Sequence, residues 1–413
     1  MEVVKSPGME KAYSYRFYPT QEQESLLRRT LGCVRLVYNR ALAERTAAWY
    51  ERQQPIGYAQ TSSMLTQWKK QDDLQFLNEV SCVPLQQGLR HLQTAFKNFF
   101  DGRAKYPNFK KKRNGGSAEF TKSAFKWKQG KVFLAKCLKP LNIRWSRQLP
   151  EGAEPSSVTI RLNSAQQWYI SLRFVDPRDL TLKPVNQAVG LDAGITSLVT
   201  LSTGEKVANP KHFNKRYQQL RQAQKALSRK QKGSRNREKA RLKVARIQAG
   251  IANSRKDHLH KLTTRLIREN QTIAVESLVV KNMVKNHKLA RAISDAGWGE
   301  MVRQLEYKAK WYGRDLVKID RWFPSSKCCG NCGHVVERLP LSVREWDCPK
   351  CGTHHDRDVN AAGNILRQCG LGAYPSRTTA VAVGHTVSVC GATVRPEESK
   401  SWKAGAKKQK PKS

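Results

Sequence analysis

The chain has 413 residues, and its 75 Lys and Arg against 33 Asp and Glu give a formal net charge of +42 at pH 7. Self-repulsion of this size opposes a compact fold, so a polyanionic partner is expected, and nucleic acid is the leading candidate because cationic side chains bind phosphates. An anionic membrane is the second candidate, but the sequence has no apolar run that could span a bilayer and no signal-peptide pattern.

The N-terminal part of the chain predicts a strand followed by a small helical module. Residues Lys11 to Tyr18 alternate aromatic and polar side chains, which is typical of a strand. Thr20 with Gln23 three residues later predicts a capped helix start, and apolar residues at helical spacing continue to Tyr50. Two further helices are expected, one ending at Trp68 and one following Pro84.

A basic loop separates this module from a β-rich segment. Lys110, Lys111, Lys112 and Arg113 follow two aromatic residues, so they are candidates for phosphate contacts, although a solvated charge run is an equal alternative. From residue 119 to residue 174 the pattern is one of short strands and turns. This pattern predicts a small β-barrel that the helical module interrupts early.

Two apolar strands in the second half each contain one acid. Asp192 lies within A-V-G-L-D-A-G-I, and Glu276 ends T-I-A-V-E. A carboxylate inside an apolar strand is costly unless it is paired or bound to a metal, and a surface-facing position is the alternative. Between them, residues 211–268 predict two very basic helices hinged at Gly233-Ser234, and so few acids accompany them that nucleic-acid binding is favoured over a solvated face.

Two C-x-x-C knuckles predict one structural zinc site. Cys329 and Cys332 form the first knuckle, and Cys348 and Cys351 form the second, at a spacing typical of a four-cysteine zinc site. Four unrelated buried cysteines are the alternative. Cys328 is adjacent and leaves open whether it or Cys329 is the ligand. Ten cysteines, four of them on a metal, indicate a cytosolic chain.

A third acid follows the second knuckle. Asp358 lies in D-R-D-V-N-A-A-G-N-I, where apolar spacing predicts a helix start, so by itself it could simply be a helix cap. With Asp192 and Glu276 it completes the kind of set that a two-metal nuclease needs, in which carboxylates hold two Mg²⁺ ions about 4 Å apart.

These segments resemble a known family. The stretches around Asp192, Glu276 and Asp358 are similar to the three segments of a RuvC-like nuclease, and their order around the two knuckles resembles TnpB, a transposon-encoded family related to type V CRISPR effectors. The resemblance covers nearly the whole chain and implies an α/β and α+β multidomain fold. Its expected parts are a β-barrel wedge domain (1–20 and 102–180), a helical recognition module (21–101), an RNase H-like RuvC nuclease domain (181–324 and 356–372), a zinc-binding insert (325–355) and a disordered basic tail (373–413).

The resemblance also implies the function. Members are RNA-guided DNA endonucleases, so Asp192, Glu276 and Asp358 are the expected catalytic ligands of two Mg²⁺ ions. The expected partners are a guide RNA from the transposon end and double-stranded target DNA, for a monomer acting on the prokaryotic nucleoid in the cytoplasm. Tyr58, Ser62 and Gln86 are the expected readers of a short motif beside the target.

Two alternatives stay open at this point. One is an RNA-guided repressor that binds DNA without cutting it, although an intact set of three acids argues against it. The other is a transposase that joins strands with the same nuclease fold.

Overall fold

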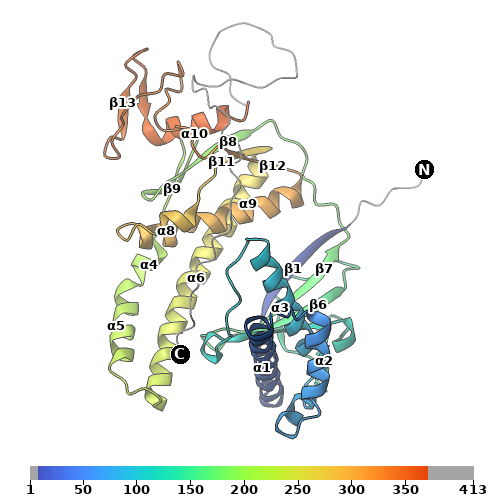
Figure 1. Cartoon of the computed structure of the whole chain (residues 1–413). Coiled ribbons are helices and arrows are strands. Elements are labelled where there is room, and N and C mark those ends of the chain that lie inside the picture. The colour runs from blue at the N-terminus through green and yellow to red at the C-terminus, as the bar shows by residue number, and fades with distance from the viewer. Residues whose placement is uncertain (1–7, 371–413) are drawn as a thin grey trace, which may run out of the picture. The chain divides into compact units, whose positions relative to one another are not determined.

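The computed structural model describes residues 8–370, so the tail expected to be disordered (373–413) lies outside the described residues. The chain divides into two compact units, each described by itself (Figure 1). The first contains the residues up to 182 together with 211–260 and 311–313. The second contains 183–210, 261–310 and the residues from 314 on.

The first unit is built from an antiparallel sheet and a group of helices. Its elements in chain order are β1 (Met9–Phe17), α1 (Gln21–Arg52), α2 (Tyr58–Trp68), α3 (Cys82–Phe100), β2 (Gly116–Thr121), β3 (Phe125–Lys128), β4 (Lys131–Leu134), β5 (Ile143–Arg144), β6 (Pro155–Leu162), β7 (Trp168–Asp176), α4 (His212–Lys215), α5 (Tyr217–Ser228) and the greater part of α6 (Arg235–Glu269). Short 3-10 turns lie at Asp72–Asn78, Lys112–Asn114 and Lys122–Ala124.

The predicted start of the long helix is confirmed. The Thr20 hydroxyl accepts a hydrogen bond from the Gln23 backbone N–H at 3.3 Å, and the Gln23 side chain accepts from the Thr20 N–H at 3.1 Å. This reciprocal pair satisfies two donors that a helix N-terminus leaves without partners. The helix after Pro84 begins two residues earlier than predicted, at Cys82, because a proline in the first turn lacks an N–H that would have no helical partner there.

The predicted barrel strands form an open sheet with a separate hairpin. The sheet order is β2-β6-β7-β1-β5, and β3 pairs only with β4 among the described strands. Side chains from this sheet and from α1 and α3 share one hydrophobic core, which includes Phe17, Val37, Leu89 and Ile160. Closure of these strands into a barrel stays a prediction.

The two basic helices predicted on either side of Gly233 are confirmed as α5 and α6, which run side by side (Figure 1). Their contact is a small apolar cluster that includes Leu220 and Ala223 of α5 and Ile247 of α6. Gly233 has a φ of 85°, a left-handed conformation that glycine adopts without strain, so the interruption in the apolar pattern marks a real turn.

A buried ion pair joins the neighbouring strands β1 and β7 of the first unit. The Lys11 ammonium on β1 lies 3.1 Å from Asp176 Oδ2 on β7, and both side chains are almost completely buried. Arg178 also donates to the Asp176 carboxylate, at 2.9 Å. These hydrogen bonds from Arg178 lower the pKa of Asp176 despite its burial.

Replacing Asp176 by asparagine should lower the free energy of unfolding of this unit by about 3–5 kcal/mol, because Lys11 would stay buried without its counter-charge. The lowered pKa means that the stabilisation is present above the ordinary aspartate pKa of about 4 and is lost as the pH falls below it. Urea unfolding at pH 7 and at acid pH measures both effects. Asp101→Asn, which breaks an exposed pair with Arg103, is the control and should cost at most about 1 kcal/mol.

The second unit is a mixed sheet with helices and a small module near its C-terminal end. Its elements are β8 (Ala188–Ala193), β9 (Ser197–Leu201), β10 (Lys206–Ala208), the end of α6, β11 (Thr272–Glu276), α7 (Val280–Met283), α8 (Ala290–Ala296), most of α9 (Trp298–Tyr312), β12 (Asp315–Ile319), β13 (Glu345–Asp347), β14 (His354–Asp356) and α10 (Arg357–Arg367). The sheet order is β10-β9-β8-β11-β12, in which β8, β11 and β12 are parallel and β9 and β10 are antiparallel.

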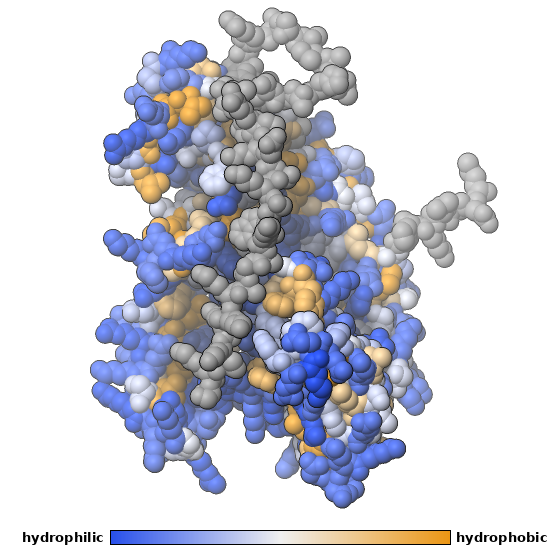
Figure 2. All heavy atoms as spheres, in the orientation of Figure 1, coloured by the Kyte–Doolittle hydropathy of each residue, from blue (hydrophilic) through white to orange (hydrophobic). Residues whose placement is uncertain are grey.

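The visible surface is mostly hydrophilic, as the net charge leads one to expect (Figure 2). Among the helices of residues 8–370, none combines the length and the apolar character needed to cross a membrane.

Candidate functional site

Two of the three predicted acids lie at the ends of neighbouring parallel strands. Leu191 of β8 is in register with Val275 of β11, so Asp192 and Glu276 follow directly on adjacent strands. Side chains alternate along a strand, which places Asp192 on the same face as Gly190, and Glu276 on the same face as Ala274. Both carboxylates therefore point to one face of the sheet.

Helix α10 covers that face and brings the third acid. Ala274 packs against Ile365 of α10, and a Cβ on Gly190 would lie 2.1 Å from the Ala362 carbonyl oxygen. The missing side chain at residue 190 therefore lets the helix lie directly on β8 (Figure 1). Asp358 lies one turn before Ala362 on the same helix, and its charge acts on Asp192.

The helix cap is Asp356 and not Asp358. The Asp356 Oδ1 atom accepts hydrogen bonds from the backbone N–H groups of Asp358 and Val359, both at 3.0 Å. Asp356 also pairs with the Lys206 ammonium at 2.5 Å. The prediction that Asp358 could be the helix cap is therefore wrong. The Asp358 carboxylate instead lies 3.5 Å from Arg344 Nη1.

Burial raises the pKa of two of the three carboxylates, and neighbouring negative charge adds to the rise at Asp192. Burial, with the negative charges of Glu276 and Asp358, raises the pKa of Asp192 to about 7, against a smaller opposing effect of Arg357 and Arg344. Burial also raises the pKa of Glu276, and the Ser325 hydroxyl, which donates to Glu276 Oε1 at 2.9 Å, partly offsets this rise. Oxygen donors grouped in this way, at the cost of mutual repulsion, fit a hard divalent cation such as Mg²⁺.

Replacing Gly190 by alanine should lower the activity of this site by at least about tenfold, because a methyl group at residue 190 would push α10, and with it Asp358, off the sheet. Gly299→Ala is the matched control, since its Cβ would meet only Val280 at 4.0 Å. The catalytic rate of each variant is measured at a temperature at which both variants are folded. Equal rates for the two variants would show that the position of α10 does not matter.

The four predicted cysteine ligands form one cluster. The sulfur atoms of Cys329, Cys332, Cys348 and Cys351 all lie within 4.8 Å of one another. The Cys329–Cys351 and Cys332–Cys348 sulfur pairs are 3.7 and 3.6 Å apart. A tetrahedral zinc with bonds of about 2.3 Å places its sulfurs about 3.8 Å apart, so the donor set and spacing fit a metal of that kind.

Cys328 does not belong to this cluster. Its sulfur contacts the carbonyl oxygens of Cys329 and Gly333, at 3.8 and 3.6 Å. The cluster therefore favours Cys329 over Cys328 as the ligand. The His355 Nε2 atom lies 3.0 Å from the Cys329 sulfur, a contact that the cysteine pattern alone did not indicate.

Two buried asparagines join the first knuckle to α10. Asn360 and Asn364 donate to the Cys328 carbonyl oxygen at 2.8 and 2.6 Å, and Asn364 also donates to the Ser325 carbonyl at 2.8 Å. The Gly330 N–H donates back to Asn360 Oδ1 at 2.9 Å. Because α10 contains Asp358 and Ser325 contacts Glu276, the asparagine contacts link the cysteine cluster to two of the three acids.

The predicted nucleic-acid residues lie in the first unit. Tyr58 is the first residue of α2, and the Arg90 side chain of α3 contacts its ring and its hydroxyl, at 5.4 Å to the ring centroid and 3.3 Å to the oxygen. Ser62 is one turn further along α2, and Gln86 is exposed one turn before Arg90. Arg90 is a cation that the sequence pattern did not single out.

The basic loop is fastened to α1. Asn39 accepts from the Lys110 N–H at 2.8 Å and donates to its carbonyl at 3.0 Å, while the Lys110 ammonium lies 4.0 Å from the centroid of the Tyr38 ring. Lys112 and Arg113 line a pocket together with Arg28, Arg29 and Arg35 of α1. The loop therefore adds to a cationic groove in the first unit, where Lys110 has a packing role of its own.

Sequence profiles of known families match three segments. Residues 171–287 match a family described as "Probable transposase" (OrfB_IS605), and residues 298–365 match a "Cas12f1-like, TNB domain". Residues 9–54 match a family described as "Helix-turn-helix domain", although this range forms one strand and a single long helix.

Whole-length relatives are also known. The chain is 57% identical over 395 residues, 95% of its length and 94% of the relative's, to a "Putative RNA-guided DNA endonuclease" of Streptomyces pristinaespiralis. It is 34% identical over 408 residues, 93% of its length and 95% of the relative's, to "Putative RNA-guided DNA endonuclease InsQ" of Escherichia coli K12. Among solved structures, the "Cas12f1-sgRNA-target DNA complex" matches with a TM-score of 0.54 at 15% identity, over 84% of this chain and 83% of that one, which shows a shared fold.

Proposed function

Since this chain belongs to the TnpB (IS605 OrfB) family, we propose that it is an RNA-guided DNA endonuclease of a transposable element. The observation on which this proposal depends most is that Asp192 and Glu276 share one face of a sheet and that helix α10, which contains Asp358, covers this face in a chain of net charge +42. The names of two whole-length relatives and the shared fold with a guide RNA and target DNA complex support the choice of partners. The mixed sheet of the second unit supports the choice of an RNase H-like nuclease domain.

The three carboxylates would hold two Mg²⁺ ions. When bound, such ions supply an activated water for attack on a phosphodiester and stabilise the leaving 3′ oxygen. The negative charges of the other two acids both raise the pKa of Asp192. The Ser325 hydroxyl orients Glu276, and the direct contact of α10 with β8 positions Asp358. The four-cysteine cluster would hold one structural zinc that takes no part in the chemistry, because all four of its positions are filled.

The side chains of the first unit would make two kinds of contact with nucleic acid. Base pairing with the guide would select the sequence, so the protein needs mainly backbone contacts, which the cationic groove of Lys112, Arg113 and α1, with Lys111 beside it, can make. Tyr58, Ser62 and Gln86 would read a short duplex motif beside the target.

Changes at the motif readers should alter which flanking motif is accepted, whereas neutralising Lys111 and Lys112 should weaken binding to every target. The salt dependence of binding should then fall by about one unit of slope for each phosphate that the protein no longer binds. A motif-library cleavage assay compares the two classes. The same flanking preference and the same rate in the Tyr58→Ala, Ser62→Ala and Gln86→Ala variants would remove those residues from the motif site.

The proposal is tested by purifying the protein from its own locus, sequencing the RNA that accompanies it and incubating the complex with matched DNA and Mg²⁺. We expect cleavage of the matched DNA. Binding without cleavage would favour the RNA-guided repressor, and covalent joining of transposon ends would favour the transposase.

A further inference from the structure

The turn that follows β12 emerges beside Glu276. Ile319, the last residue of β12, is in register with Glu276 of β11. The Ser277 hydroxyl donates to the Ile319 carbonyl at 2.7 Å, and the Trp322 N–H donates to Asp320 Oδ1 at 2.8 Å. Phe323 packs against the apolar cluster that contains Ile319. The turn is therefore fixed on both sides of Arg321 and Trp322.

Arg321 and Trp322 form an exposed pair on this fixed turn. The Trp322 side chain is 78% exposed, and the Arg321 guanidinium lies 4.6 Å from the centroid of its ring. A single exposed apolar residue needs no explanation. An indole and a guanidinium held together, however, are the side chains that stack on nucleobases and contact phosphates.

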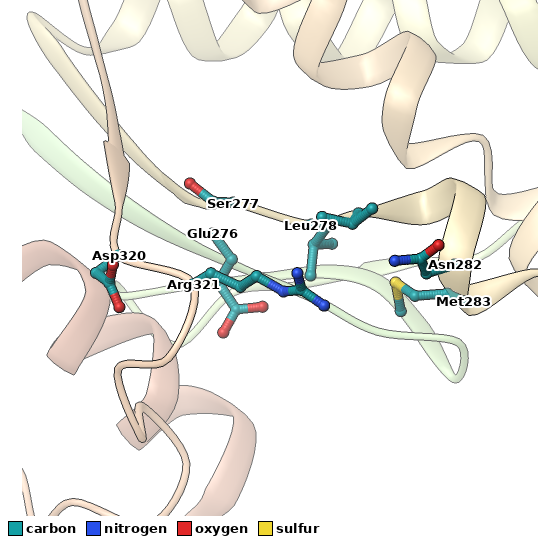
Figure 3. Close-up of a pocket in the computed structure, with 8 residues that line it drawn as sticks. Glu276, Ser277, Leu278, Asn282, Met283, Asp320 and Arg321 are labelled. Carbon is teal, nitrogen blue, oxygen red and sulfur yellow. The ribbon is translucent and has the colours of Figure 1, made fainter. Parts of the chain in front are cut away.

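The pair also adjoins the carboxylates. Arg321 and Glu276 line one pocket of about 230 Å³, whose apolar wall includes Leu278 and Met283. Figure 3 shows the Arg321 side chain extending past the Glu276 carboxylate toward Leu278. A phosphodiester is negatively charged, and Arg321, which lines the same pocket as Glu276, has the charge and the reach to contact one next to the acids.

We propose that Arg321 and Trp322 bind one unpaired nucleotide of the DNA strand next to the phosphate that is cut, with Trp322 stacked on its base and Arg321 on its phosphate. This inference rests on the proposed nuclease function. Stacking accepts any base, which suits an enzyme whose target sequence is chosen by a guide. The pair would thus hold the strand in place at the metal ions whatever its base sequence.

The test crosses protein variants with DNA variants. The guide RNA complexes of wild-type protein, Trp322→Ala and Trp322→Phe are each assayed on matched targets that have one abasic nucleotide at successive positions around the cut. On intact DNA, Trp322→Ala should lower kcat/KM about 5- to 150-fold. Trp322→Phe should restore most of it, because phenylalanine also stacks. The matched control is Trp49→Ala, at a tryptophan that is 50% exposed on α1, and it should leave the rate unchanged.

The position of the missing base decides the outcome. At one abasic position, wild-type protein should fall to the rate of Trp322→Ala, and the variant should show no further decrease. The stacking site is refuted if the missing base and the Trp322→Ala substitution lower the rate independently at every position, so that their effects multiply. It is also refuted if Trp322→Ala cuts like wild-type protein. Arg321→Ala should mainly raise KM and flatten its salt dependence, with Arg321→Lys intermediate.

A second readout does not depend on cutting. An unpaired strand that contains 2-aminopurine should lose fluorescence on binding to the wild-type complex and should lose less on binding to Trp322→Ala. Trp322-dependent quenching without any cleavage would overturn the nuclease function and leave the binding site standing. Equal quenching by both proteins would refute the site, whatever the cleavage result.

Discussion

Asp192→Asn should reduce DNA cleavage by at least about 10³-fold while the RNA complex still binds its target. The substitution removes one of the oxygen ligands that the two proposed catalytic ions would share, and the stabilisation that such ions provide is worth several kcal/mol in the transition state. Cleavage of a labelled target under single-turnover conditions measures the loss, and a gel-shift titration measures binding. Asp315→Asn, at an exposed carboxylate on β12, is the control and should cleave like wild-type protein.

The same substitution should stabilise the metal-free protein. Asp192 has a pKa raised to about 7 in the folded chain, so the folded state binds an extra proton between about pH 4 and pH 7 and loses stability as the pH rises through that range. The asparagine side chain of the variant has no charge to bury. We therefore expect the variant to gain on the order of 1–3 kcal/mol in EDTA at pH 8 and little at pH 4. A loss of stability at pH 8 would mean that Asp192 has a structural role instead.

Cys329→Ser should release the metal of the cysteine cluster and loosen α10. Structural zinc binding provides roughly 10–16 kcal/mol in small domains, and the cluster here contacts α10 through Asn360 and Asn364. Hydrogen exchange in α10 should rise, and cleavage should fall with it, because α10 positions Asp358. Metal analysis and exchange mass spectrometry together measure these effects.

Cys328→Ser is the matched control, since it changes the neighbouring sulfur outside the cluster. It should keep one metal per chain and wild-type exchange in α10. Loss of metal in Cys328→Ser with retention in Cys329→Ser would reverse the ligand assignment. Metal loss in Cys329→Ser without a change in α10 would show that the asparagine contacts do not couple the two sites.

Local signals in the sequence predicted much of the fold. The capping pair of Thr20 and Gln23, the turn at Gly233 and the two apolar strands with Asp192 and Glu276 were all predicted, because each depends on residues close in sequence. The short strands β2, β3 and β10 were missed. Strand β2 depends on its pairing with the distant β6, whereas β3 and β10 form hairpins with the neighbouring β4 and β9 and are too short to show an alternating pattern.

Parts of the site could not be predicted in this way. D-R-D offers two carboxylates to one helix start, and only the three-dimensional structure shows that Asp356 takes the cap and leaves Asp358 to the site. Gly190 gave no sign of its contact with Ala362, which lies far along the chain. Asn360 and Asn364 did give a signal, since two amides four residues apart on the apolar face of a helix need buried partners.

Exchanging guides tests the proposed function most directly. Two DNA targets with the same flanking motif are incubated with Mg²⁺ and the protein, loaded with the guide for one target or with the guide for the other. We predict that each complex cuts only the DNA that matches its guide and that Asp192→Asn cuts neither. Cleavage that ignores the guide, or no cleavage of matched DNA by the wild-type complex, would contradict it.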